Sequence, residues 1–211
     1  MSSYTTNIPV NNTFNITAVF GQKGSLWKNG HKGVDITAEN KTIYSICDGE
    51  VTVVGWDADG WGRYVSIKPA GFERIRIILC HLVKDSVKVK VGDKVSRLTK
   101  IGTMGTTGNS TGVHLHVEMR VDNTAVDPTP YMQLQNKKAS GLKDTDFKFS
   151  PENQNSALAA VLNAFDAKSG NQPLRSQDNE KIKNLEAELA KTKAELLLAN
   201  NRLENVRKAL A

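Results

Sequence analysis

The chain has 211 residues, which is enough for one compact domain and an additional segment. Hydrophobic residues make up 39% of it, a low share for a fully packed protein, so part of the chain is expected to lie outside any core. The formal net charge is +6, but neither a run of Lys and Arg nor a row of aromatic residues accompanies it, which argues against nucleic acid as a partner.

The N-terminal residues contain no basic cluster followed by an apolar core, so no signal peptide is predicted. No apolar run approaches the length of a membrane span. The protein is therefore expected to remain in the cytoplasm that makes it unless something else releases it. Cys47 and Cys80 each lie in an apolar run and are interpreted as buried free thiols, because a bridge between them would require an oxidising compartment.

Residues 1–13 are polar and are expected to be flexible. Between residues 14 and 135, short β-branched and aromatic runs alternate with Gly, Asn and Asp turns, without a helical pattern. The predicted strands are 14–20, 42–47, 50–56, 63–68, 74–80, 86–91, 100–104 and 114–121. This pattern predicts a mainly β domain, built on an antiparallel sheet, over residues 14–135.

Two further segments follow the predicted β domain. Residues 136–180 are expected to form a linker with one short helix, which begins near Ser150-Pro151. In residues 181–211, apolar or small residues alternate spacings of three and four, which predicts a C-terminal α-helical coiled coil. These positions are Ile182, Leu185, Leu189, Thr192, Leu196, Ala199, Leu203, Val206 and Leu210. Self-association through this tail is the favoured interpretation, and a lone amphipathic helix docked on its own domain is the alternative.

The sequence predicts a metal site formed by His31, Asp35 and His116. His114 and His116 are two positions apart in a predicted strand, so both side chains face the same side of the sheet. His31 and Asp35 lie close together in a segment that Gly33 allows to curl around an ion. Three N and O ligands with a fourth position left for water are typical of a catalytic zinc, as opposed to a closed structural zinc.

His81 and His114 are predicted to lie beside this metal without binding it. A zinc ion can lower the pKa of its bound water to roughly 7 and can polarise a carbonyl. One of the two histidines could take a proton from that water, and the other could stabilise the oxyanion or protonate the leaving amine. Any one of these histidines alone is more often a surface or core residue than a ligand, so the prediction depends on all four occurring in these contexts.

Nine short segments of the sequence together resemble a known family of peptidases. They are Phe20-Gly21, His31-Lys32-Gly33-Val34-Asp35, Asp48-Gly49-Glu50-Val51, His81-Leu82, residues 89–95, Ile101-Gly102, residues 105–112, His114-Leu115-His116 and Val126-Asp127-Pro128. In this order and at this spacing, residues 20–132 resemble the M23 family of metallopeptidases, the lysostaphin-like (LytM) peptidoglycan endopeptidases.

The resemblance implies an antiparallel β-sheet domain with a groove over a zinc ion, and a substrate in the peptide stems and cross-bridges of bacterial peptidoglycan. It implies that His31, Asp35 and His116 are the zinc ligands, and that His81 and His114 are the two catalytic histidines. The alternative is a catalytically inactive LytM-like binding or structural module, but inactive members have lost some of these five residues.

Two departures from the family pattern concern substrate binding. Many members carry a tyrosine at the position of Leu79, and members that cleave glycyl-glycine bonds usually read Ser-Thr-Ala-Pro where residues 110–113 read Ser-Thr-Gly-Val. The second difference favours cleavage within stems or direct cross-links. The missing signal peptide and the coiled coil favour a phage-encoded lysin or a tail-associated hydrolase, a homo-oligomer that could have other phage tail proteins as partners.

Overall fold

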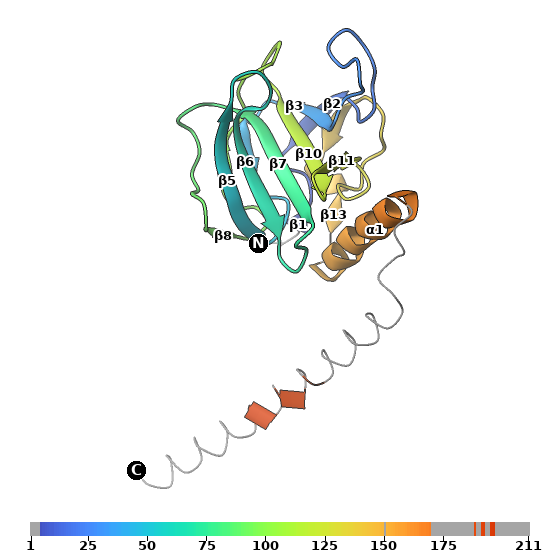
Figure 1. Ribbon diagram of the computed structural model, residues 1–211. Coiled ribbons are helices and arrows are strands. Elements are labelled where there is room, and N and C mark those ends of the chain that lie inside the picture. The colour runs from blue at the N-terminus through green and yellow to red at the C-terminus, as the bar shows by residue number, and fades with distance from the viewer. Residues whose placement is uncertain (1–4, 150, 170–187, 189–190, 193–194, 197–211) are drawn as a thin grey trace, which may run out of the picture. The chain divides into compact units, whose positions relative to one another are not determined.

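The computed structural model describes residues 5–149, 151–169, 188, 191–192 and 195–196 (Figure 1). Residues 1–165 and 166–211 form two separate units. The strands are β1 (Thr5–Thr6), β2 (Thr13–Ala18), β3 (Val34–Ala38), β4 (Thr42–Tyr44), β5 (Gly49–Asp57), β6 (Gly62–Pro69), β7 (Ile75–Leu82), β8 (Lys94–Val95), β9 (Lys100–Thr103), β10 (Leu115–Val121), β11 (Thr124–Val126), β12 (Ala139–Lys143) and β13 (Lys148–Phe149). The helices are the 3₁₀ turn η1 (Asp144–Asp146) and α1 (Pro151–Ser169).

One large sheet organises the first unit. Its strand order is β12-β2-β3-β10-β7-β6-β5-β8, with β11 paired to β10, and every pairing is antiparallel (Figure 1). Two small antiparallel sheets pair β4 with β9 and β1 with β13. The mainly β, antiparallel fold predicted from the sequence is confirmed.

The hydrophobic core lies on one face of the large sheet. Val34 and Ile36 of β3 are fully buried, as are Leu115 and Val117 of β10, because residues two apart in a strand face the same side. Ile101 of β9 belongs to the same cluster, so the small β4–β9 sheet packs against the large one. The opposite face of the sheet remains available for polar side chains, and it carries the site described below.

One strand was not predicted, and one predicted strand does not form. Residues 34–38 alternate apolar and polar residues and form β3, although no strand was predicted there and the segment His31–Asp35 was expected to curl around an ion. Residues 86–91 alternate in the same way but form no strand. Val87 and Val89 pack on the core, and Lys88 donates one backbone hydrogen bond to Ile101. Alternation predicts half-buried extended backbone, but a strand also requires a neighbour with free backbone groups along its length.

The ordered domain extends beyond the expected bounds of 14–135. Ile8 and Val10, in the segment expected to be flexible, are fully buried in the core. Strand β12, in the segment expected to be a linker, adds to the edge of the sheet beside β2. Burial of two β-branched side chains and capping of an exposed sheet edge both stabilise these segments.

Helix α1 begins at Pro151, at the predicted start of a helix, and Leu158 and Leu162 join the hydrophobic core. The predicted coiled coil at 181–211 lies almost entirely outside the described residues.

No helix in the described part of the chain combines the length and apolar character that crossing a membrane requires. Cys47 and Cys80 are buried free thiols, as predicted.

Candidate active site

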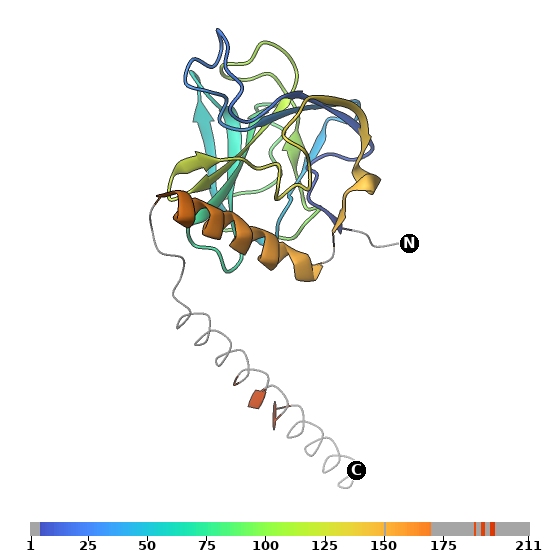
Figure 2. The same cartoon turned by 90° about the vertical axis from the view of Figure 1, so that its right-hand side faces the viewer.

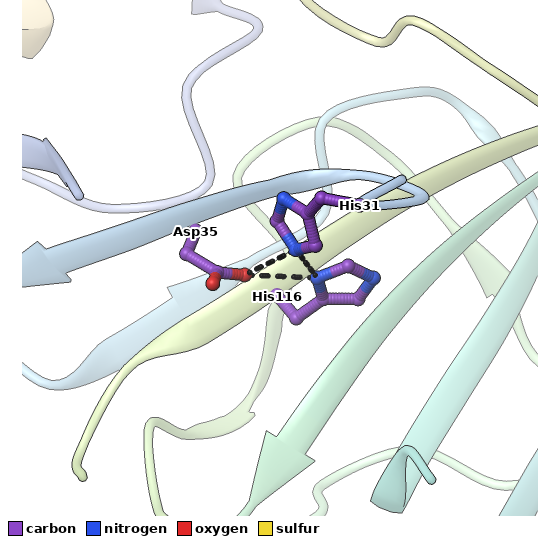
Figure 3. Close-up of side chains that lie close together, drawn as sticks. All are labelled: His31, Asp35 and His116. Atoms are coloured by element: carbon purple, nitrogen blue, oxygen red, sulfur yellow. Dashed lines mark hydrogen bonds and ion pairs between the residues drawn. The ribbon is translucent and has the colours of Figure 1, made fainter. Parts of the chain in front are cut away.

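Three side chains converge on the polar face of the sheet (Figure 3). Nδ1 of His116 lies 2.8 Å from Oδ1 of Asp35, and Nε2 of His31 lies 3.1 Å from the same oxygen. The two histidine nitrogens are 3.0 Å apart. All three residues are at least 90% buried. The structure therefore brings together the three ligands that the sequence predicts.

The pairing of β3 with β10 creates this arrangement. Asp35 and His116 are directly paired across the two strands, so their side chains stand next to each other on one face. His31 comes from the loop that precedes β3, a blue loop that projects from the domain in Figure 2. Its ring packs 4.5 Å from the ring of Trp27, and its Nδ1–H donates to the carbonyl of Val19. That bond leaves Nε2 with a lone pair for a metal.

The donor set fits a zinc ion. Tetrahedral ligands 2.0–2.2 Å from zinc lie about 3.3 Å from one another, so only a small expansion of the three-atom cluster is needed. Two imidazole nitrogens and one carboxylate oxygen are ligands that zinc prefers. Within the described residues no fourth protein ligand joins the cluster, which leaves one tetrahedral position for water or substrate.

The charges of the site also suit a cation. Burial alone would raise the pKa of Asp35, but its hydrogen bonds to His116 and His31 hold the pKa well below its usual range. Burial alone would lower the pKa of His116, but Asp35 and Glu118 raise it to about 9. Without a metal, His116 therefore holds a proton between two carboxylates. A metal ion would replace this proton, because a ligating histidine must be neutral.

His81 reaches the site through a bulge in β7. Between its pairings with Arg63 and Val65 of β6, strand β7 contains one residue more than β6, and His81 has a φ of +60°. Cys80 is paired with His116 across the two strands, so the side chain of Cys80 lies on the site's face of the sheet. In a regular strand the next residue, His81, would then point to the opposite face. The bulge redirects the His81 ring, which lies 4.6 Å from the ring of His114.

The protonation state of His81 is fixed by its surroundings. Burial lowers its pKa to about 4, although a hydrogen bond to the carbonyl of Thr107 acts in the opposite direction. The ring is therefore neutral at pH 7, and Nδ1–H donates to the carbonyl oxygen of Thr107 at 2.8 Å. Nε2 then carries a lone pair, as a general base requires.

His114 directly precedes β10, the strand that pairs with β7, and its ring lies beside that of His81. Its Nδ1–H donates to the carbonyl of Gly112 at 2.8 Å, and its Nε2 lies 3.7 Å from Oδ1 of Asp35. Its side chain is 16% exposed, more than those of the three candidate ligands. His114 therefore lies next to the three candidate metal ligands and is accessible to a substrate.

Cys80 does not contribute a nucleophile. It lies under the site and is fully buried, and burial raises the pKa of its thiol well above the usual value. A protonated buried thiol is unreactive.

The site opens into a cleft of about 620 Å³. One wall is formed by the loop at 25–32, the other by the loop at 109–111, and the floor by Trp61, Glu118 and Arg120 of the sheet and its connections. His31, Asp35 and His116 line the same cleft, so a substrate bound in it would lie beside the candidate metal ligands.

Comparison with known proteins agrees with this geometry. Residues 29–128 match the model of peptidase family M23. This region belongs to peptidase family M23. The peptidoglycan DD-endopeptidase ShyB of Vibrio cholerae is 39% identical over 98 residues, which are 46% of this chain and 22% of that protein.

Solved structures of similar domains support the assignment. The catalytic domain of the antimicrobial peptidase lysostaphin from Staphylococcus simulans superposes with a TM-score of 0.52 at 28% identity, covering 57% of this chain and 92% of that domain. A zinc containing peptidase from Vibrio cholerae gives a TM-score of 0.50 at 32% identity, covering 59% of this chain and 39% of the other. The chain spans less than half the length of its curated relatives: it covers 20%, 42% and 29% of the first three.

Glu118 is a residue of the M23 domain that the sequence analysis missed. It follows His116 by two positions in β10, so it faces the same side, and it is fully buried. Burial alone would raise its pKa, but His116 and Arg120 hold the pKa below its usual range. The alternation His-x-His-x-Glu was the available signal: the same face of the strand carries a third polar residue after the two histidines.

Gly33 packs so closely against its neighbours that a larger residue would not fit. We expect Gly33→Ala to lower both the stability of the M23 domain and its affinity for zinc. A Cβ at Gly33 would lie against the backbone carbonyl of Val117 and 2.7 Å from Cε1 of His116. Overpacking of this kind costs about 1–3 kcal/mol of stability. Because the His116 ring would have to move, zinc affinity should fall as well. Thermal unfolding and titration with zinc measure the two effects.

Gly24→Ala is the matched control for this substitution. A Cβ at Gly24 would have no heavy atom within 4 Å. Its stability should change by less than about 0.5 kcal/mol, the usual range for a surface substitution. If Gly33→Ala behaved like Gly24→Ala in both measurements, the close packing of Gly33 against His116 would be disproved.

Proposed function

We propose that the protein is a zinc-dependent endopeptidase that hydrolyses peptide bonds in the stems or cross-links of bacterial peptidoglycan. The observation that carries the proposal is the convergence of His31, Asp35 and His116 at the floor of a cleft, with His81 and His114 beside them. A peptidoglycan endopeptidase and a zinc containing peptidase among the similar proteins support the substrate class and the metal.

Each residue has a distinct role in this proposal. A bound zinc ion would supply a Lewis acid and would make water a stronger acid. His81 is neutral and has Nε2 free, so it accepts the proton of the attacking water. His114, once protonated on Nε2, donates to the developing oxyanion or to the leaving amine. The two loops that form the walls hold the peptide across the site.

The presence of a complete site favours an active enzyme over an inactive LytM-like module. All five residues expected of an active enzyme are present in the sequence. Four of them are more than 90% buried: His31, Asp35, His81 and His116. The rings of His81 and His114 are each held by a hydrogen bond to a backbone carbonyl, that of Thr107 for His81 and that of Gly112 for His114. Such preorganisation is expected of catalytic groups.

Metal content and bond cleavage together test the proposal. The purified chain is loaded with zinc, dialysed and analysed for metal, and new amino termini are counted after incubation with peptidoglycan from bacteria of different cross-link types. We expect about one zinc per chain, loss of amine release on treatment with a chelator, and recovery on addition of zinc. A chain that binds no metal, or that releases no amine from any of the walls, would contradict the proposal. Mass spectrometry of the fragments would identify the bond.

We also propose that residues 181–211 make the protein a homo-oligomer, as would suit a phage lysin or a tail-associated hydrolase. The heptad spacing of the sequence supports this, and a polar linker separates the heptads from the β domain in the sequence. Sedimentation of the full chain and of a variant that ends at residue 169 tests it. Monomers of both at micromolar concentration would exclude self-association through the tail.

A further inference from the structure

A buried carboxylate lies directly behind the candidate metal ligands. Glu118 is fully buried, and its Oε2 lies 3.5 Å from Nε2 of His116, the ring nitrogen that faces away from the metal cluster. An unpaired carboxylate at such a position would be costly. The structure instead provides a partner for each of its two oxygens.

Trp61 and Arg120 hold the carboxylate in place. Nε1–H of Trp61 donates to Oε2 of Glu118 at 2.8 Å, and Nε and Nη2 of Arg120 lie 2.8 Å and 2.7 Å from Oε1. Arg120 is itself fixed, because Nη1 donates to the carbonyl of Asn123 and its guanidinium lies 5.1 Å from the centre of the Trp61 ring. Glu118 is therefore held rigidly, with Oε2 facing His116.

His31 and His116 present different ring nitrogens to the candidate metal position. His31 faces the cluster with Nε2 and donates Nδ1–H to the carbonyl of Val19. His116 faces the cluster with Nδ1, so its Nε2 needs an acceptor for its proton. In the neutral ring one nitrogen carries the proton and the other the lone pair, so the position of the acceptor decides which nitrogen is free for a metal.

We propose that Glu118 is a positioning residue, which accepts the Nε2–H of His116 and so fixes the tautomer that presents Nδ1 to zinc. Trp61 and Arg120 keep the carboxylate oriented for this contact. The proposal rests on the zinc-dependent function proposed above, but it concerns the affinity of the site and can be tested without a substrate. A carboxylate behind a ligating histidine typically contributes a factor of about 10–100 in metal affinity.

The test compares zinc affinity in three variants and the wild type, measured by competition with a chromophoric chelator. Glu118→Gln keeps the shape of the side chain but removes the charge, and it is expected to bind zinc about 10–100 times more weakly. Trp61→Phe keeps the carboxylate but removes the Nε1–H donor and part of the ring beside Arg120, so a smaller loss in the same direction is expected. Glu50→Gln is the matched control, because this carboxylate pairs with Lys94 at the surface, away from the cleft.

A second measurement reads the tautomer directly. In the zinc form, ¹⁵N NMR should place the proton of His116 on Nε2 in the wild type, and this preference should weaken in Glu118→Gln. Equal zinc affinities in Glu118→Gln and the wild type, with only the melting temperature lowered, would mean that Glu118 has a structural role alone and would overturn the proposal. A wild type that binds no zinc would instead disprove the metal site itself, together with the role of Glu118.

Discussion

Replacement of His116 by alanine should leave the chain without zinc after dialysis and should lower peptidoglycan cleavage by more than about a thousandfold. Loss of a single general acid or base typically costs 10²–10⁴-fold, and loss of the metal removes more of the chemistry than that. His116 provides one of three ligand atoms that lie within 3.1 Å of one another. Metal analysis and amine release, both on the same preparation, measure the effect.

Asp35→Asn serves as the second variant, because His116→Ala removes a buried ring that lies between Asp35 and Glu118 and so could weaken the fold itself. The asparagine has nearly the same shape as the aspartate but lacks the negative charge that a metal ligand needs. It should also lose zinc and activity while circular dichroism remains unchanged. If either variant were folded and retained full activity, His31, Asp35 and His116 would not form the catalytic metal site.

His81→Ala is expected to reduce the catalytic rate on the order of 10²–10⁴-fold while the protein keeps about one zinc per chain. His81 lies close to the cluster, at 5.9 Å between its ring and that of His116, but it contributes no ligand atom to it. Its proposed role is to accept a proton, so the loss should appear in kcat more than in KM. Loss of zinc in His81→Ala at neutral pH would instead make His81 part of the metal site.

The pH profile of the wild type gives an independent measure of the same role. The pKa of His81 is lowered from 6.5 to about 4, so the folded protein keeps this ring neutral as the pH falls below 6.5, and protonates it only near pH 4. With the zinc content measured at each pH, kcat should therefore persist below pH 6.5 and decline towards pH 4. A decline of kcat centred at 6.5, with zinc still bound, would contradict a neutral His81 as the base.

The sequence was sufficient to predict that five particular residues would meet. Spacing placed His114 and His116 on one face of a strand, and the other residue contexts suggested His31, Asp35 and His81 as their partners. The resemblance to the M23 family then implied a role for each of the five. The structure brings all five into the lining of one cleft, and the substitutions above test their roles in catalysis.

Features that depend on partners distant in the sequence were not predictable in this way. The segment at 86–91 alternates as regularly as β3, yet only β3 has neighbours to pair with on both sides. The bulge that turns His81 into the site depends on how β7 aligns with β6. The orientation of the Glu118 carboxylate was likewise not predictable, because its partner Trp61 lies 57 positions earlier in the chain.

The pairing of Asp35 with His116 also bears on the order in which the protein is assembled. These residues are separated by 81 positions, and the cluster does not exist until β10 has joined β3. A growing chain therefore could not hold an ion at this site in the early stages of its synthesis, when only the segment around Asp35 has emerged. The two strands would have to pair first, and an ion bound afterwards would shift the equilibrium further towards the folded state.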